Sequence, residues 1–207
     1  MHIRFIAHII NLVVTEGLKE VNILVDRIRA AIKFVRHSSL RLKKFKECVQ
    51  REKIESKKLL CLDVSTRWNS TYLMLNSAIK FERAFERFGD CDPYFIKDLT
   101  DERGPGVPTA FDWDNARRMV QVLEHFYELT IQISGSLYVT SNDFFHEISD
   151  VECLSNEWIT GIDFDLSVMG QRMKEKYDKY WENVKKMNML LSPYLILMIP
   201  KHSCYDF

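Results

Sequence analysis

Asp63-Val-Ser-Thr-Arg-Trp-Asn-Ser-Thr-Tyr-Leu73 is the segment that decides the fold, because a polar turn here leads directly into an amphipathic helix. The hydroxyl groups of Ser65 and Thr66 are suited to cap the first turn of that helix. Apolar residues then recur with helical spacing and mark one face as core: Tyr72, Leu75, Ile79, Phe85 and Phe88. We therefore predict helical structure from about residue 66 to residue 88.

The Arg67-Trp68 pair at the start of this helix has two interpretations. An exposed guanidinium beside an indole at a helix N-terminus suits a DNA phosphate and a stacked base. The residues by themselves favour a structural role, with Trp68 as a core anchor and Arg67 in a surface ion pair. Both interpretations stay open at this point.

Composition by itself indicates a soluble helical domain. The 207 residues are enough for one large or two small domains with a buried core. Hydrophobic residues make up 46% and exclude a disordered tail, while only seven Gly and five Pro favour long helices. The five cysteines are scattered without a Cys-x-x-Cys motif, which predicts reduced thiols inside a cell.

The zero net charge is the sum of two unlike parts. Residues 27–58 carry twelve Lys and Arg against three Glu, a net of +9, and the remainder carries a net of −9. Such a basic helical segment suits a polyanion such as DNA, because each cation at a phosphate releases condensed counterions. The alternative is a solvated face whose cations pair with the acidic half of the same chain.

The hydrophobic pattern predicts a short strand followed by helices. The strand is expected at residues 3–6, and Pro and Gly place a surface loop at residues 89–109 with one helical turn at about residues 94–99. The expected helices cover approximately residues 7–19, 20–36, 39–54, 66–88, 112–134, 141–158 and 166–186.

No residue pattern indicates catalysis, a metal site or a cofactor. His8 and the scattered thiols lack zinc-ligand spacing, and no Cys-His pair is implied. The acidic clusters at residues 90–92 and 163–165 are typical of helix caps and solvated loops. The apolar run at residues 189–200 is too short to cross a bilayer and contains Pro193, so no membrane contact is expected.

Four ordered blocks of sequence resemble plant transposases of the hAT superfamily, of the Ricesleeper and Daysleeper type. The longest is residues 63–85, Asp-Val-Ser-Thr-Arg-Trp-Asn-Ser-Thr-Tyr-Leu-Met-Leu-Asn-Ser-Ala-Ile-Lys-Phe-Glu-Arg-Ala-Phe. Arg4 with residues 7–14, residues 41–48 (Arg-Leu-Lys-Lys-Phe-Lys-Glu-Cys) and residues 134–148 agree in order. The resemblance covers roughly residues 3–191.

This resemblance implies an incomplete RNase H-like transposase domain. Such transposases use an acidic triad with two metal ions, and a helical insertion interrupts their core before the third acid. The aligned blocks begin after the second acid and end before the third, and they include neither the BED zinc finger nor the dimerisation segment. We expect a core remnant with basic helices at residues 1–60, the helical insertion at residues 61–191 and a divergent tail at residues 192–207.

The resemblance also implies roles for two residues. His8 matches the histidine of a Cys-x-x-His motif near the scissile phosphate, although Phe5 replaces the cysteine. Trp68 matches the aromatic residue that is thought to stack on a flipped base. The complete predicted DNA-binding set is Arg67, Trp68, Lys43, Lys44, Lys46, His8, Arg36 and Arg41.

We therefore expect a nuclear, transposase-derived protein that binds DNA with weak sequence selectivity and lacks catalytic activity. The alternatives are an interaction remnant that forms a homo-oligomer or packs on a transposase-like partner without DNA affinity, and a transposon relic without function. No metal and no cofactor are expected.

Overall fold

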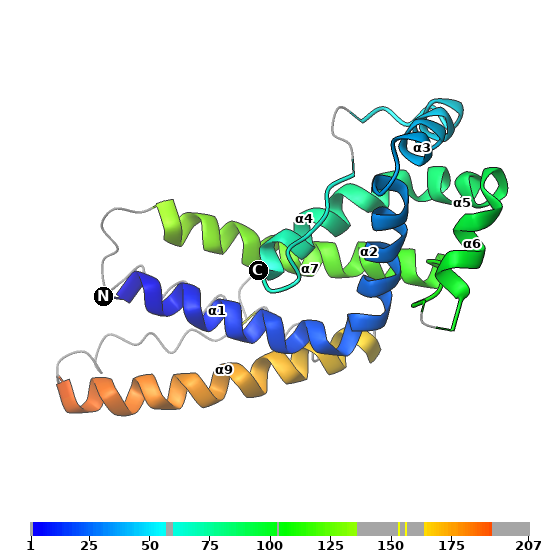
Figure 1. Cartoon of the computed structure of the whole chain (residues 1–207). Coiled ribbons are helices and arrows are strands. Elements are labelled where there is room, and N and C mark those ends of the chain that lie inside the picture. The colour runs from blue at the N-terminus through cyan, green and yellow to red at the C-terminus, as the bar shows by residue number, and fades with distance from the viewer. Residues whose placement is uncertain are drawn as a thin grey trace. The chain divides into compact units, whose positions relative to one another are not determined.

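The computed structural model of the chain describes residues 2–56, 60–102, 104–135, 153, 156 and 164–191, and no strand occurs among them. The predicted mainly α fold is therefore confirmed (Figure 1). In chain order the helices are α1 (His2–Leu18), α2 (Asn22–Arg36), α3 (Ser39–Arg51), α4 (Trp68–Ala78), α5 (Glu82–Cys91), α6 (Pro93–Thr100), α7 (Ala110–Gly135) and α9 (Phe164–Leu191), with 3-10 turns at Lys19–Val21 and Ile79–Phe81. The helix expected at residues 141–158 lies outside the described residues.

The prediction of an N-terminal strand at residues 3–6 is wrong. These residues form the first turns of α1. Their apolar positions Ile3 and Ile6 continue the helical spacing of Ile10 and Val13, so the same stripe runs from the start of the helix. A strand also needs a neighbour to satisfy its backbone groups, and no strand exists in the described part of the chain to supply one.

The helix predicted at residues 66–88 is interrupted by the 3-10 turn Ile79–Phe81, which separates α4 from α5. This tighter turn shifts the phase of the apolar stripe. Ile79, expected in the core, is only half-buried, whereas Phe81 is buried in its place. Phe85 and Phe88 then continue the buried face along α5, as the sequence predicts.

The chain divides into two compact units, and each is described by itself. Unit 1 comprises residues 1–20 with residues 125–207, and unit 2 comprises residues 21–124. The division expected from the resemblance, at residues 60 and 191, concerns the boundaries of the transposase core and stays a prediction.

In unit 1, α1 and α9 run antiparallel and side by side (Figure 1). Glu16 pairs with Lys176 at 3.2 Å, and Glu20 pairs with Arg172 at 3.2 Å. Gly17 lies so close to α9 that a Cβ atom there would be 2.5 Å from Cγ of Met173. The absent side chain of Gly17 is therefore what allows the two helices to pack closely.

In unit 2, aromatic rings form the centre of the core. Phe45 of α3 lies 4.7 Å from Phe85 between ring centroids, and Phe85 in turn stacks on Trp113 of α7 at 5.6 Å. Phe34 of α2 contacts Phe95 of α6 edge-to-face at 5.4 Å. Because such rings bury large apolar areas, this cluster joins five helices of unit 2 through a single core.

The start of α7 is fixed by a reciprocal capping box. The backbone N–H of Thr109 donates to Oδ2 of Asp112 at 2.8 Å, and the N–H of Asp112 donates to Oγ1 of Thr109 at 3.3 Å. Arg27 of α2 donates to both carboxylate oxygens of Asp112 and to the carbonyl oxygen of Pro105. The loop before α7 is thus held by a cation of the basic segment.

We predict that Gly17→Ala lowers the stability of unit 1 relative to wild type. In the Met173→Ala background, the same substitution should raise the stability relative to Met173→Ala alone. Overpacking costs about 1–3 kcal/mol, whereas the higher helix propensity of Ala gains up to about 1 kcal/mol. Removing the Met173 side chain leaves Cγ of Met169, 3.1 Å from the added Cβ, as the nearest atom, and a shift of a few tenths of an ångström by this flexible side chain relieves that contact, so that the propensity gain remains. Thermal unfolding of the four proteins of this double-mutant cycle measures the stability change caused by Gly17→Ala in each of the two backgrounds.

The control is Gly89→Ala in α5, where the nearest atom to an added Cβ, in Phe95, is 3.8 Å away and no clash arises. That variant should be neutral or stabilised. Equal effects of Gly17→Ala in both Met173 backgrounds would contradict the close helix approach.

Candidate nucleic-acid interface

Helix α3 has one buried face and one basic face. Phe45 and Cys48 are buried in unit 2. Lys43 and Lys46 are exposed, and within the described residues neither side chain has a hydrogen bond or an ion pair. The spacing of three residues places these two lysines on the same side of the helix, away from the core.

Two other cations predicted at the site have protein partners. Lys44 pairs with the buried carboxylate of Asp92 at 3.5 Å. Arg41 pairs with Asp98 at 3.4 Å, and its guanidinium lies 3.6 Å above the ring of Phe34. These contacts fix α3 against α2 and α6, so Lys44 and Arg41 have a structural role in this arrangement.

Arg36 of α2 is exposed but donates from Nη1 to the carbonyl oxygen of Leu60. This bond holds the connector that leads from α3 to α4. Arg36 is therefore intermediate between the unpaired lysines and the cations in ion pairs. Its guanidinium has a hydrogen-bond acceptor but no carboxylate partner in the described residues.

The connector itself is anchored by a buried ion pair between Asp63 and Arg29 of α2. Nη2 of Arg29 lies 2.7 Å from Oδ2 of Asp63, and Thr71 of α4 donates to the same carboxylate at 2.9 Å. Burial raises the pKa of Asp63, but the hydrogen bonds from Arg29 and Thr71 outweigh it and hold the pKa below the ordinary 3.8. The first residue of the deciding segment therefore joins α2 to α4.

The structure separates the Arg67-Trp68 pair. Trp68 is 5% exposed and lies in the core, whereas Arg67 is exposed and has no side-chain partner among the described residues. The core interpretation of Trp68 agrees with this burial, while the expected ion pair of Arg67 is not found in the described part. Base stacking by Trp68 requires the indole to leave the core.

The predicted capping by Ser65 and Thr66 does not occur. Arg67 is the residue before α4, and the helix start has no side-chain cap. Ser70 closes the turn instead, because its hydroxyl accepts from the N–H of Val64 at 2.9 Å and lies within hydrogen-bond distance of two backbone carbonyls. Ser65 and Thr66 are exposed.

His8 is exposed on α1 and belongs to unit 1, whereas the other predicted site residues belong to unit 2. Phe5 is in the same helix. No group of three or more His, Cys, Asp or Glu side chains in the described residues could hold a metal ion.

The sequence missed the acidic partners of the basic segment. Arg27 pairs with Asp112 across 85 residues of sequence, and Lys44 pairs with Asp92. Only the opposite net charges of the two parts of the chain hinted at such pairing. Among the described residues of the segment, five exposed cations remain without a hydrogen bond or an ion pair: Lys33, Lys43, Lys46, Arg51 and Lys53.

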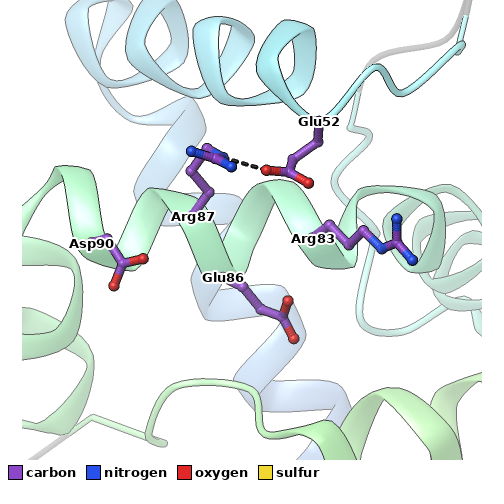
Figure 2. A pocket seen from close by; sticks show the side chains of 5 residues that line it. All are labelled: Glu52, Arg83, Glu86, Arg87 and Asp90. Atoms are coloured by element: carbon purple, nitrogen blue, oxygen red, sulfur yellow. Dashed lines mark hydrogen bonds and ion pairs between the residues drawn. The ribbon is translucent and has the colours of Figure 1, made fainter.

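A shallow pocket lies where α3 ends beside α5, and its lining is mixed in charge. Figure 2 shows Glu52, Arg83, Glu86, Arg87 and Asp90 around it, with Arg87 turned toward Glu52. The hydrogen bond from Arg87 to Glu52 raises the pKa of the guanidinium. Because acidic and basic groups alternate here, the pocket does not resemble a phosphate site.

Two family models match the chain. The model described as the ZBED1 RNase-like helical domain matches residues 3–122, and the model described as the hAT-like transposase, RNase-H fold, matches residues 142–197. The chain belongs to the hAT transposase family. The recognition from the four sequence blocks is therefore confirmed.

Several curated plant proteins are similar to the chain over most of its length. The putative AC transposase of Zea mays is 32% identical over 181 residues, which cover 87% of the chain and 22% of that protein. The zinc finger BED domain-containing protein RICESLEEPER 2 of Oryza sativa subsp. japonica is 32% identical over 190 residues, covering 92% and 25%. DAYSLEEPER of Arabidopsis thaliana is 28% identical over 153 residues, covering 72% and 21%.

The hAT chain thus spans about a quarter of the length of these relatives. No solved structure matches it. Among the described residues, none of the helices combines the length and apolar character that a bilayer crossing requires.

We predict that Asp63→Asn destabilises unit 2 by about 3–5 kcal/mol at neutral pH, because it leaves the guanidinium of Arg29 without its buried charge partner. The contribution of Asp63 is present above its ordinary pKa of 3.8 and is lost as the pH falls through the lower folded-state pKa. The stability difference between wild type and variant should therefore shrink below about pH 4. Urea unfolding over a pH series measures it.

Asp26→Asn is the matched control, because Asp26 pairs with the same Arg29 but its side chain is 55% exposed. It should cost less than about 1 kcal/mol. An Asp63→Asn effect that is equally small, or that stays constant on acidification, would contradict the buried pair.

Proposed function

We propose that this transposase-derived chain binds DNA through the outward face of α3, with Arg67 as a second phosphate contact. The observation that carries the proposal is the set of exposed cations in the basic segment that have no protein partner among the described residues. Lys43 and Lys46 are central to it, because they project from one side of a helix whose other side is fixed in the core.

The ion pairs within the chain divide the cations of the basic segment into structural ones and ones available to bind DNA. Lys44 and Arg41 neutralise Asp92 and Asp98 and hold α3 in place. The cations that remain have no competing carboxylate in the described residues, so a DNA phosphate is the partner that their charge best accommodates. A lysine is a flexible point charge without a fixed donor geometry, and such contacts position the backbone of DNA without reading its sequence. Weak sequence selectivity follows.

Trp68 has an indirect role in this proposal. Its buried indole anchors the first turn of α4 and thereby holds Arg67 at the surface. An exposed guanidinium at the mouth of a helix suits a phosphate oxygen. A direct stacking contact would require Trp68 to exchange core packing for a base. We therefore assign phosphate binding to Arg67 and positioning to Trp68.

We further propose that the chain acts in the nucleus and binds DNA without cutting it. The relatives include proteins named as transposases and as BED zinc finger proteins, which supports a setting where DNA is present. We infer from the resemblance that the four aligned blocks do not include the complete acidic triad. Supercoiled plasmid with Mg²⁺ or Mn²⁺ should stay supercoiled in the presence of the chain, and nicking would overturn this part of the proposal.

A second candidate function is interaction with another copy of the chain or with a transposase-like partner. Leu62 and Val64 of the connector and Leu73 of α4 are 42%, 52% and 44% exposed. Exposed apolar side chains in neighbouring segments favour protein contact. A stable dimer in light scattering, together with no DNA binding at low salt, would favour this candidate over the first.

We predict that Lys43→Gln/Lys46→Gln weakens binding to duplex DNA and lowers the salt slope by about 1.8, since each phosphate contact contributes about 0.9. Fluorescence anisotropy across a salt series measures both quantities. Lys80→Gln/Lys97→Gln is the matched control. It removes the same charge from two exposed lysines of unit 2, outside the basic segment.

The proposed interface is contradicted if both double variants reduce the slope equally, because binding would then follow net charge alone. Arg67→Gln should reduce binding without lowering thermal stability, since the side chain has no partner to lose among the described residues. A loss of stability in that variant without a loss of binding would remove Arg67 from the interface.

A further inference from the structure

The outward side of α3 contains a carboxylate among its cations. Glu47 is exposed, and in the described part of the chain its side chain has no hydrogen bond or ion pair. Lys43 precedes it by four residues and Arg51 follows it by four, and both are exposed and lack an ion pair there as well. Residues four apart lie on the same side of a helix, so the charges along this side alternate as positive, negative, positive.

This side of α3 is the one that a second macromolecule can contact. The helix packs on α2 and α5 through the side that holds Phe45 and Cys48. It lies at an edge of unit 2 in Figure 1. Leu40 and Gln50 are also exposed on the outward side, since their positions along the helix are turned away from the two buried residues.

We propose that α3 enters the major groove of duplex DNA and that Glu47 reads a base there, by accepting a hydrogen bond from the N4 amino group of a cytosine. The inference rests on the DNA contact proposed above for α3. It adds the form of the DNA and the residue that gives sequence preference. One reading residue gives a preference at one base pair, which agrees with the weak selectivity that the lysine contacts imply.

The spacing of the three charges fits the width of the groove. A helix rises about 1.5 Å per residue, so Lys43 and Arg51 are separated by about 12 Å along the helix axis. The major groove of B-form DNA is about 12 Å wide and admits an α-helix. When the helix enters at an inclination, Lys43 and Arg51 approach the phosphates on the two sides of the groove. Glu47 lies midway between them and faces the base edges.

The chemistry of a carboxylate selects cytosine among the four bases. An ionised Glu47 only accepts hydrogen bonds, and phosphate groups repel it. In the major groove cytosine presents an amino donor, whereas guanine and thymine present acceptors. Adenine places its amino group beside the N7 acceptor, and this pair suits an amide that both donates and accepts. The cations at Lys43 and Arg51 offset the repulsion between Glu47 and the backbone.

The test measures the base preference of the full chain. A pool of duplexes with random central base pairs is bound at constant salt, and the bound fraction is sequenced. We expect enrichment of a C·G pair at one position. Replacing that pair by T·A puts the thymine O4 acceptor in place of the amino donor and should weaken binding about fivefold or more. Equal affinity for the two duplexes would overturn the proposal.

Two variants distinguish base reading from simple charge repulsion. Glu47→Ala should bind the C·G and T·A duplexes with equal affinity. Glu47→Gln should shift the preference toward adenine, because an amide matches its paired donor and acceptor. If Glu47→Ala instead raises the affinity for both duplexes by the same factor and keeps their ratio, Glu47 is only a repulsive charge and the proposal is wrong.

Glu86→Gln on α5 is the matched control. Glu86 is exposed and, among the described residues, has no hydrogen bond or ion pair, so this variant removes the same charge away from α3. It should keep the wild-type preference for C·G. The Glu47 variants and this control all replace an exposed side chain without a partner, so their thermal unfolding should match that of wild type.

A duplex of RNA with the selected sequence tests the groove. Its A-form major groove is deep and narrow and does not admit a helix, so the C·G preference should be absent on RNA. The same preference on RNA would overturn the major-groove contact. Binding of duplex DNA that depends on Lys43 and Lys46 but shows no base preference would remove base reading and leave the DNA-binding proposal intact. No binding to any duplex at low salt would remove both.

Discussion

The packing of Phe45 against the phenylalanines of α5 is the contact on which the arrangement of unit 2 depends. Its ring lies 4.7 Å from that of Phe85 and 5.8 Å from that of Phe88, between ring centroids. Because an α-helix turns by about 100° per residue, fixing one core residue also fixes the direction of every other side chain of α3. Lys43 and Lys46 are directed to solvent for the same reason that Cys48 is directed inward.

Electrostatics refines this geometry without creating it. A +9 segment would repel itself if all its cations were solvated together, and the structure relieves this by inserting carboxylates between them. Asp63 and Asp112, whose side chains are 1% and 5% exposed, accept from Arg29 and Arg27. A lone carboxylate at such depth would be costly, so these aspartates and arginines depend on each other. Among the cations left over, Lys43 and Lys46 lie on the side of α3 that faces away from the core, where no carboxylate pairs with them within the described residues.

The sequence predicted the parts of the fold that depend on local periodicity. The stripes of α2, α5 and α7 follow the 3.6-residue spacing, and their buried residues were expected at Ile28, Phe88 and Phe126. The sequence-based prediction was wrong where a short apolar pattern fits both a strand and a helix. The four residues 3–6 are too few to distinguish strand from helix, and only their continuity with the rest of α1 decides. The 3-10 turn at residues 79–81 also left no clear sequence signal.

The candidate site was predictable only in part, because the local sequence does not show whether a lysine or arginine has an ion-pair partner in the fold. Lys43, Lys44 and Lys46 are close neighbours in one helix, and rotation about its axis alone directs Lys44 toward Asp92. That partner lies 48 residues away and is not visible in any local pattern. Arg67 and Trp68 illustrate the same limit of prediction from local sequence. They are adjacent at the start of a helix, but Arg67 is exposed and Trp68 is buried.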